Sequence, residues 1–197
     1  MMNQSYLNQA DLLLQVIPHI AAENTLALKG GTAINLFLRS MPRLSVDIDL
    51  TYLPFDSRET ALDNISDSLN RIRKRITKSI PGATVNNHII EGNDVKLLVQ
   101  SKNAQIKIEV NTTTRGHLHS IRLLHVNEMV QERFQKFAAI QVVSDAELYG
   151  GKICAALDRQ HPRDLFDVFL LFQESGYNED IKNGLIQALV SHMRTIH

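Results

Sequence analysis

The chain has 197 residues, of which 44% are hydrophobic and 21% charged, enough apolar mass for the core of one domain or of one domain with a small addition. The 21 basic and 21 acidic residues balance, so net charge indicates no nucleic-acid or membrane partner, and any such surface must be local. The single cysteine, Cys154, excludes an intrachain disulfide framework and fits a reducing compartment.

The N-terminal segment, MMNQSYLNQADLLLQVIPHIAAEN, has neither the basic region nor the unbroken apolar core of a signal peptide. No apolar run approaches the roughly 18 residues that a membrane span needs. We therefore predict a cytoplasmic globular protein with no membrane partner.

Helical and extended patterns alternate in the first part of the chain. Apolar residues at helical spacing predict a helix over 6–22, TLALKG predicts a strand halted by glycine, and TAINLFLRS predicts a helix. RLSVDIDLTYL, residues 43–53, alternates strictly between apolar residues and polar ones that include Asp47 and Asp49. This period of two indicates a half-buried strand.

A long amphipathic helix is predicted over residues 57–80, with acidic residues early and the basic run RIRKRITK late. That run is either a solvated helix face or a surface that follows an RNA backbone. TVNNHII, DVKLLVQS and QIKIEVN, separated by EGN and KNA, predict antiparallel strands joined by hairpins. IRLLHV and AAIQVVS predict two further short strands.

The pattern becomes helical from Ser144 onward. SDAELYGGKICAAL begins with Ser144 and Glu147 at capping-box spacing, and DRQHPRD then breaks the helix. DLFDVFLLFQES predicts a second helix that Gly176 ends, and a last helix is predicted over 179–194. We therefore divide the chain into a core, residues 1–143, and a C-terminal helical region, residues 144–197.

Two carboxylates stand one residue apart in the otherwise apolar strand. Residues i and i+2 of a strand point the same way, so Asp47 and Asp49 are expected to share a face and to repel each other. A cation offsets that repulsion, and Mg²⁺, or Mn²⁺ in its place, suits a few carboxylates together with water and phosphate oxygens. The alternative is an acidic strand edge that discourages aggregation.

A pair of glycines precedes the second predicted helix. Gly30 and Gly31 would let backbone N–H groups approach a ligand without an intervening Cβ, and the helix start favours an anion. With Thr32 they form a candidate phosphate-binding turn, or else a plain connection between strand and helix. Strand parity also places Ser45 and Arg43 beside the aspartates, which makes Ser45 a candidate nucleotide-binding residue. A metal site beside such a turn predicts a protein that handles a nucleoside triphosphate.

A third carboxylate is available from the segment QIKIEVN. Its isoleucine and valine side chains face one way, and Lys107, Glu109 and Asn111 face the other. If this strand neighbours the aspartate pair, three carboxylates converge and can hold two metal ions. The alternative for Glu109 is a cross-strand pair with a lysine.

The segments GGTAINLF, RLSVDIDL and GGKICAALDRQHPRDLFDV resemble the nucleotidyltransferase toxins of the AbiEii/AbiGii type, a branch of the polymerase-β-like nucleotidyltransferase superfamily. The resemblance is densest over residues 26–53 and 144–172. It implies an α/β (α+β) fold, with a mixed, mainly antiparallel sheet flanked by helices and C-terminal helices that complete the active site. Such toxins are usually longer than this chain.

The resemblance also implies roles for residues of the C-terminal region. Lys152 is expected to bind the triphosphate as a point charge, and Asp164 to lie in the active site. The structural alternative for Lys152 is an ion pair with Asp164 or Asp167. The structural alternative for Asp164 is an acid at a helix N-terminus, where the helix dipole favours it. Further phosphate-binding candidates are Arg43, Arg159 and Arg163.

We therefore expect a Mg²⁺-dependent enzyme, using two ions, that moves a nucleotidyl group from an NTP to a hydroxyl acceptor. The expected catalytic residues are Asp47, Asp49, Glu109, Lys152 and Asp164. The resemblance implies that the acceptor is RNA, a tRNA 3′ end in particular, and that a cognate antitoxin exists. Three alternatives stay open: a small-molecule acceptor, as in antibiotic-modifying enzymes; a nucleotide-binding module without activity; and a metal-dependent nuclease.

Overall fold

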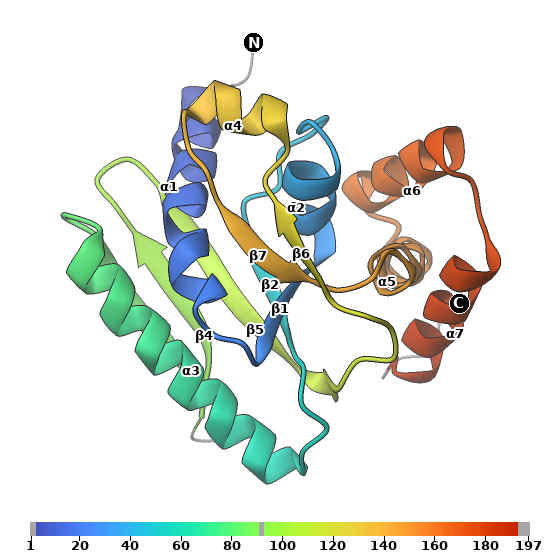
Figure 1. Cartoon of the computed structure of the whole chain (residues 1–197), viewed down its shortest axis with the longest axis horizontal. Helices are drawn as coiled ribbons and strands as arrows, with labels where there is room; N and C mark the ends of the chain where they lie inside the picture. The colour runs from blue at the N-terminus through green and yellow to red at the C-terminus, as the bar shows by residue number, and fades with distance from the viewer. Residues whose placement is uncertain (1–2, 91–92, 193–197) are drawn as a thin grey trace.

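A seven-stranded mixed sheet with the order β3-β4-β5-β2-β1-β7-β6 forms the centre of the computed structural model, which describes residues 3–90 and 93–192 (Figure 1). Its strands are β1 Leu26–Lys29, β2 Ile48–Tyr52, β3 Thr84–Ile90, β4 Asn93–Gln100, β5 Gln105–Arg115, β6 Arg122–His125 and β7 Ala139–Val142. Neighbouring strands run antiparallel except for β2–β5 and β1–β7, which confirms the mixed, mainly antiparallel sheet.

The helices are α1 Gln4–Ala21, α2 Gly30–Thr32, η1 Ala33–Leu38, α3 Arg58–Ser79, α4 Glu128–Phe134, α5 Asp145–Arg159, α6 Pro162–Glu174 and α7 Glu179–Val190. Helices α1 and α3 pack on the sheet, while α5, α6 and α7 gather in a separate group that meets the rest of the chain near α2 (Figure 1). In the part of the chain described, every helix is too short or too polar to cross a bilayer.

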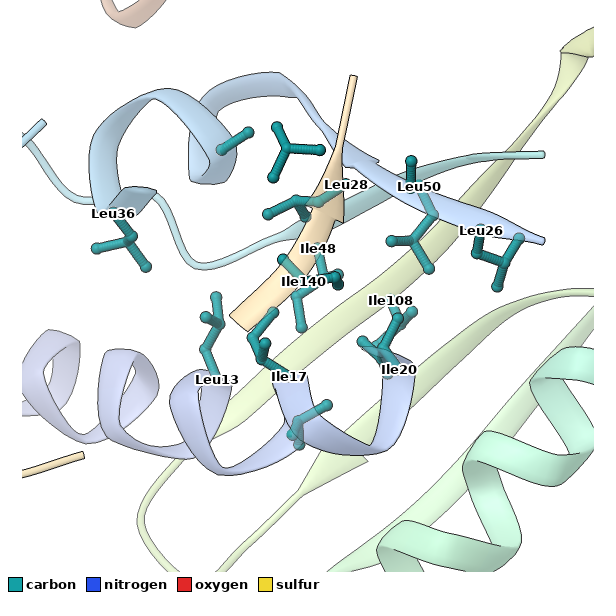
Figure 2. Packing of buried hydrophobic residues seen from close by; sticks show 14 of the residues in the cluster. Leu13, Ile17, Ile20, Leu26, Leu28, Leu36, Ile48, Leu50, Ile108 and Ile140 are labelled. Carbon is teal, nitrogen blue, oxygen red and sulfur yellow. The ribbon is translucent and has the colours of Figure 1, made fainter. Parts of the chain in front are cut away.

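The main core lies between α1 and the sheet (Figure 2). Leu13, Ile17 and Ile20 recur on one face of α1, as their spacing of three and four residues dictates, and all are buried. They face apolar residues of the central strands, among them Ile48 and Ile108. Burial of one such side chain contributes roughly 1.5–3 kcal/mol, which fixes how α1 and the sheet sit together.

The same burial decides which strand face carries the charged groups. Ile48 and Leu50 are buried in the core, so the intervening Asp49 points to the opposite face of β2. On β5, Ile108 is buried likewise, and Lys107 and Glu109 are only partly buried. A slip of one residue would turn the carboxylates into the core, so the apolar alternation holds their register.

The strand predicted over 43–53 is shorter than expected. Residues 43–47 are irregular, and β2 begins only at Ile48. The Thr32 hydroxyl donates a hydrogen bond to the Asp47 carbonyl oxygen (2.5 Å) and lies 3.1 Å from Ser45 Oγ. Contacts with the glycine turn thus replace ladder hydrogen bonds, and Asp47 precedes the strand rather than lying within it.

The helix predicted from TAINLFLRS begins earlier, at Gly30, and is π-helical from Ala33 to Leu38. Its wide last turn closes with the Arg39 N–H donating to the Ile34 carbonyl (3.0 Å). Helix α4 was not predicted, because its seven residues carry too short an apolar pattern to show helical spacing.

The C-terminal helices agree closely with the sequence pattern. The Ser144 hydroxyl accepts from the Glu147 N–H (3.2 Å) at the start of α5, and Gly176 follows α6 with a φ of 70°. Helix α6 begins at Pro162, earlier than expected, because His161 Nδ1 caps it by accepting from the Arg163 N–H (3.1 Å). The end predicted for the last helix, residues 193–194, and most of the EGN turn lie outside the described residues.

Part of the basic run on α3 has a structural role. Arg71 donates to the buried Glu23 carboxylate (Nη2–Oε2 2.7 Å), and Arg75 makes a second short contact with it. Burial alone would raise the pKa of Glu23, but the hydrogen bonds from these arginines hold it below its ordinary value. The Lys74 and Lys78 side chains remain exposed at a shallow surface pocket.

We expect Glu23→Gln to be less stable than the wild type at pH 7, with a difference that narrows as the pH falls. A carboxylate with a lowered pKa contributes its stability above the unfolded value of about 4.3 and loses it as the pH drops through the folded value. Urea denaturation at a series of pH values measures this difference. Asp63→Asn, an exposed change on α3 beyond its first turn, should show no such trend, and a difference for Glu23→Gln that is independent of pH would contradict the assignment.

Candidate functional site

The carboxylates meet where two parallel strands lie side by side. Strand β2 pairs with β5 so that Asp49 stands directly opposite Glu109. Both side chains come from the sheet face opposite the α1 core, and the exposed Asp47 immediately precedes β2. The adjacency of β2 and β5, on which the predicted convergence depends, is therefore present, and Asp47 lies in the segment before β2 and not in the strand.

The glycine turn lies against this group. Gly30 has a φ of 76°, and a Cβ built there would stand 2.8 Å from Asp49 Oδ2. A Cβ on Gly31 would stand 2.7 Å from Ser45 Oγ and 2.8 Å from Arg43 Nη2. Both glycines are thus required by close approach, and their turn holds the segment that carries Ser45 and the aspartates.

We expect Gly30→Ala to lower stability by more than the roughly 1–2 kcal/mol that a left-handed alanine costs, and to lower activity. The added Cβ must also displace the Asp49 carboxylate. Gly82→Ala is the matched control, because Gly82 has a similar φ of 73° and no neighbour within 4 Å of a Cβ. Thermal unfolding of both variants separates backbone strain from the clash, and equal losses in both would contradict a role for the contact with Asp49.

Charges around the carboxylates are only partly balanced. Burial raises the pKa of Asp49 above its ordinary value; Lys107 opposes this shift, and Asp47 and Glu109 reinforce it. Lys29, directly opposite Asp49 on β1, has its pKa lowered by burial, against the attraction of Asp49. Asp47 and Glu109 therefore repel the Asp49 carboxylate, and Lys107 and Lys29 attract it.

Glu109 has lysine partners in this structure. Lys107 Nζ lies 2.8 Å from Glu109 Oε2, and Lys96 Nζ, from the directly opposite position on β4, lies 3.4 Å from Oε1. Burial alone would raise the pKa of Glu109, but the hydrogen bond and charge of Lys107 lower it. The cross-strand pair with a lysine, which was the structural alternative for Glu109, is therefore present.

The donor set suits a hard divalent cation, because carboxylate oxygens are the ligands that Mg²⁺ and Mn²⁺ take. Asp49 and Glu109 occupy facing positions on adjacent strands, and Asp47 immediately precedes β2. Yet among residues 3–90 and 93–192 no group of three or more His, Cys, Asp or Glu side chains stands ready around one ion. Glu109 would have to turn from its lysines to complete the set.

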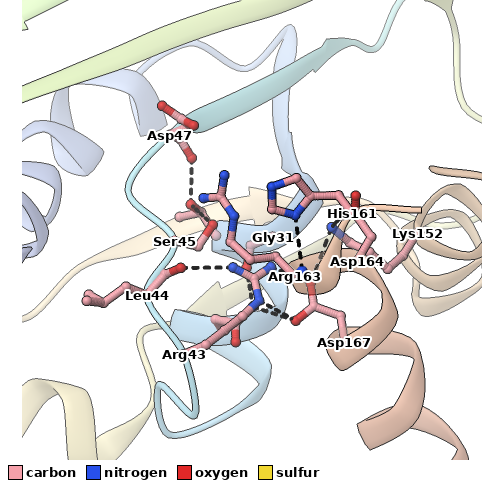
Figure 3. A network of polar contacts seen from close by, with 12 residues as sticks. Gly31, Arg43, Leu44, Ser45, Asp47, Lys152, His161, Arg163, Asp164 and Asp167 are labelled. Carbon is pink, nitrogen blue, oxygen red and sulfur yellow. Dashed lines mark hydrogen bonds and ion pairs between the residues drawn. The ribbon is translucent and has the colours of Figure 1, made fainter. Parts of the chain in front are cut away.

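A buried polar cluster joins the C-terminal helices to the glycine turn (Figure 3). Lys152 Nζ lies 2.8 Å from Asp164 Oδ1 and 3.3 Å from Asp167 Oδ2, and all three residues are buried. Asp167 also accepts from Arg43 Nε (2.7 Å) and from Asn35 Nδ2 (3.2 Å). The cluster thus ties α5 and α6 to η1 and to the segment before the aspartates.

The predicted residues of the C-terminal region divide into paired and exposed groups. Lys152 and Asp164 form an ion pair, which is the structural alternative that we considered for Lys152, and Arg159 Nε adds a 2.6 Å contact to Asp164 Oδ2. These basic partners lower the pKa of Asp164, against the effect of its burial. Arg43 points to Asp167 and away from the carboxylates, whereas Arg163 is exposed.

Sequence reasoning gave no role to Asn35 and Lys107, and considered Asp167 only as an ion-pair partner. The positions of Lys107, two residues before Glu109, and Asp167, three residues after Asp164, were the available signals, since each shares a face with its neighbour. Asn35 carried no comparable signal, because its partners Gly31 and Asp167 come together only in the tertiary structure.

Comparison with known proteins places this geometry in a family. The family model described as nucleotidyl transferase AbiEii toxin, type IV toxin–antitoxin system, matches residues 11–196. A search of curated proteins gave no match.

Solved structures share the fold at low sequence identity. MenT4, a nucleotidyltransferase toxin from Mycobacterium tuberculosis H37Rv, superposes with a TM-score of 0.67 and 16% identity over 94% of this chain and 68% of its own. A putative nucleotidyltransferase from H. pylori gives 0.56 and 19% over 99% and 86%, and JHP933 from Helicobacter pylori gives 0.54 and 19% over 97% and 82%. With the family match over nearly its whole length, the chain belongs to the AbiEii family of nucleotidyltransferase toxins of type IV toxin–antitoxin systems.

Proposed function

We propose that this enzyme transfers a nucleotidyl group from an NTP to a hydroxyl of RNA, a tRNA 3′ end in particular, in a Mg²⁺-dependent reaction in the cytoplasm. The observation that carries the proposal is the facing pair Asp49 and Glu109 on adjacent parallel strands, with Asp47 just before β2 and the Gly30 turn against Asp49. Membership of a toxin family of type IV toxin–antitoxin systems supports a cognate antitoxin and a nucleotide substrate.

Asp47, Asp49 and Glu109 would hold up to two Mg²⁺ ions, or Mn²⁺ in their place. When bound, the ions would lower the pKa of the attacking hydroxyl and stabilise the departing pyrophosphate. Asp49 and Glu109 come from paired strands whose register is fixed, so they would hold the reacting groups with little loss of order at the moment of transfer.

The glycine turn is the proposed position of the triphosphate. Gly30 and Gly31 have no side chain of their own to keep a ligand away from the backbone N–H groups, and Ser45 lies against Gly31. Thr32 is fully buried, and its hydroxyl is used by Asp47 and Ser45. We therefore assign Thr32 the task of holding the segment that carries Asp47.

Residues 144–197 are proposed to complete the site from the side of the glycine turn. Lys152 lies between two buried carboxylates, so direct triphosphate binding would require it to leave one of them. The geometry favours a positioning role in which Lys152, Asp164 and Asp167 fix α6 and Arg43 beside the turn. Arg163 is exposed and stays the more available phosphate-binding candidate in this region.

Incubation of the pure protein with α-labelled NTPs, Mg²⁺ and total tRNA tests the proposal, with aminoglycosides offered in parallel. We expect label in tRNA that disappears when the divalent cation is chelated. Label on the aminoglycoside alone would replace RNA with a small-molecule acceptor. Tight NTP binding without turnover on either acceptor would indicate a binding module, and hydrolysis of tRNA without incorporation would indicate a nuclease.

A further inference from the structure

Lys107 places an ammonium group among the carboxylates proposed to bind metal. It lies two residues before Glu109 on β5 and so shares its face of the sheet, with Nζ 2.8 Å from Glu109 Oε2. Because Asp49 stands opposite Glu109, the register places Lys107 level with Asp47, which immediately precedes β2.

The surrounding charges are consistent with this placement. The hydrogen bond to Glu109 raises the pKa of Lys107, burial opposes the shift, and the Asp47 and Asp49 carboxylates reinforce it. Lys96 takes the other Glu109 oxygen, Oε1, at 3.4 Å. Both oxygens of Glu109 therefore face ammonium groups, and a metal ion bound to Oε2 would lie beside the positive charge of Lys107.

We propose that Lys107 is a built-in counter-ion of the metal site: it holds Glu109 in place of a divalent cation and weakens the binding of that cation. This inference rests on the proposed function, which assigns the carboxylates to the metal. Its consequence is that removal of the lysine charge leaves Glu109 Oε2 free and the aspartates less compensated, so a divalent cation binds more tightly.

A binding titration of the full chain with Mn²⁺ tests the inference. Electron paramagnetic resonance measures the free ion, at fixed pH and without nucleotide. Lys107→Met keeps much of the apolar stem and removes the charge, and we expect it to bind Mn²⁺ about tenfold more tightly, a change of about 1.4 kcal/mol. Lys107→Arg keeps a cation there and should stay near the wild type. Lys102→Met is the matched control, because it removes the same charge from the exposed β4–β5 turn, and it should change the affinity less than about twofold.

The outcomes separate this inference from the proposed function. If wild type and Lys107→Met bind Mn²⁺ equally, or the variant binds more weakly, Lys107 does not compete with the metal, and the carboxylate site itself stands. An equal gain in Lys102→Met would reduce the effect to net charge and would also overturn the inference. If no form binds Mn²⁺, both the inference and the proposed metal site fail. Circular dichroism of each variant establishes that the comparison is made on folded protein.

Discussion

Asp49→Asn is expected to lower nucleotidyl transfer by about 10²–10³-fold, on the scale that loss of one preorganised charge-stabilising group produces. The change removes a negative charge and almost no volume. Asp49 stands opposite Glu109 and against the Gly30 turn, so the lost charge lies at the centre of the proposed site. Label incorporation from an NTP into the proposed tRNA acceptor measures the effect.

The free energy of unfolding of Asp49→Asn distinguishes a catalytic aspartate from a structural one. Burial raises the pKa of Asp49, so the ionised form at pH 7 opposes folding, and the neutral asparagine should leave stability equal or higher. Asp63→Asn, the same change at an exposed position of α3, should leave activity and stability unaltered. If Asp49→Asn transfers nucleotides at the wild-type rate, or loses activity only because it unfolds, the metal assignment is wrong.

The sheet and its polar face could be predicted because local alternation carries that information. Ile48 and Leu50 on β2, and Ile106 and Ile108 on β5, must all be buried, and this requirement alone turns Asp49 and Glu109 to one face. The two carboxylates can meet only if β2 and β5 are neighbours in the sheet, and the tertiary structure shows that they are. Residue spacing cannot show it, since the long helix α3 and a whole hairpin separate the two strands.

The irregular segment before β2 could not be predicted because its partners are distant in sequence. Arg43 donates to Asp167, 124 residues away, and the Thr32 hydroxyl donates to the Asp47 carbonyl, so tertiary contacts take the place of ladder hydrogen bonds in this segment. A strict apolar alternation over 43–47 still favours a strand locally, and long-range ion pairing overrides it. The same cause explains why Arg43 was expected beside the aspartates and lies instead against α6.

The sequence is compatible with two roles for Lys152, triphosphate binding and an ion pair within the protein. A lysine in an apolar helix needs a counter-charge, and Asp164 and Asp167 provide it at hydrogen-bonding distance. The resemblance to nucleotidyltransferase toxins carries no information on whether such a lysine meets the substrate or holds the residues that do. We propose the positioning role because Asp167 pairs with Lys152 and Arg43 together.

Asp167→Asn is expected to cost about 3–5 kcal/mol of stability, the range measured when one partner of a buried ion pair is removed. Asp167 is fully buried and receives Arg43, Asn35 and Lys152. An amide would leave Arg43 and Lys152 as buried charges with less compensation. For a chain of this size such a loss lowers the midpoint of thermal unfolding by about 6–20 °C.

The matched control is Glu179→Gln, since Glu179 pairs with Lys182 on the surface of α7, where an ion pair is worth less than about 1 kcal/mol. Urea denaturation of both variants gives the free energies. Activity adds a second readout, because Arg43 and Asn35 connect Asp167 to the glycine turn, through the close approach of Arg43 to Gly31 and the hydrogen bond of Asn35 to its carbonyl. We therefore expect kcat to fall at temperatures where Asp167→Asn is still folded. An unfolding free energy within about 1 kcal/mol of the wild type would show that the C-terminal helices are held to the turn by other contacts.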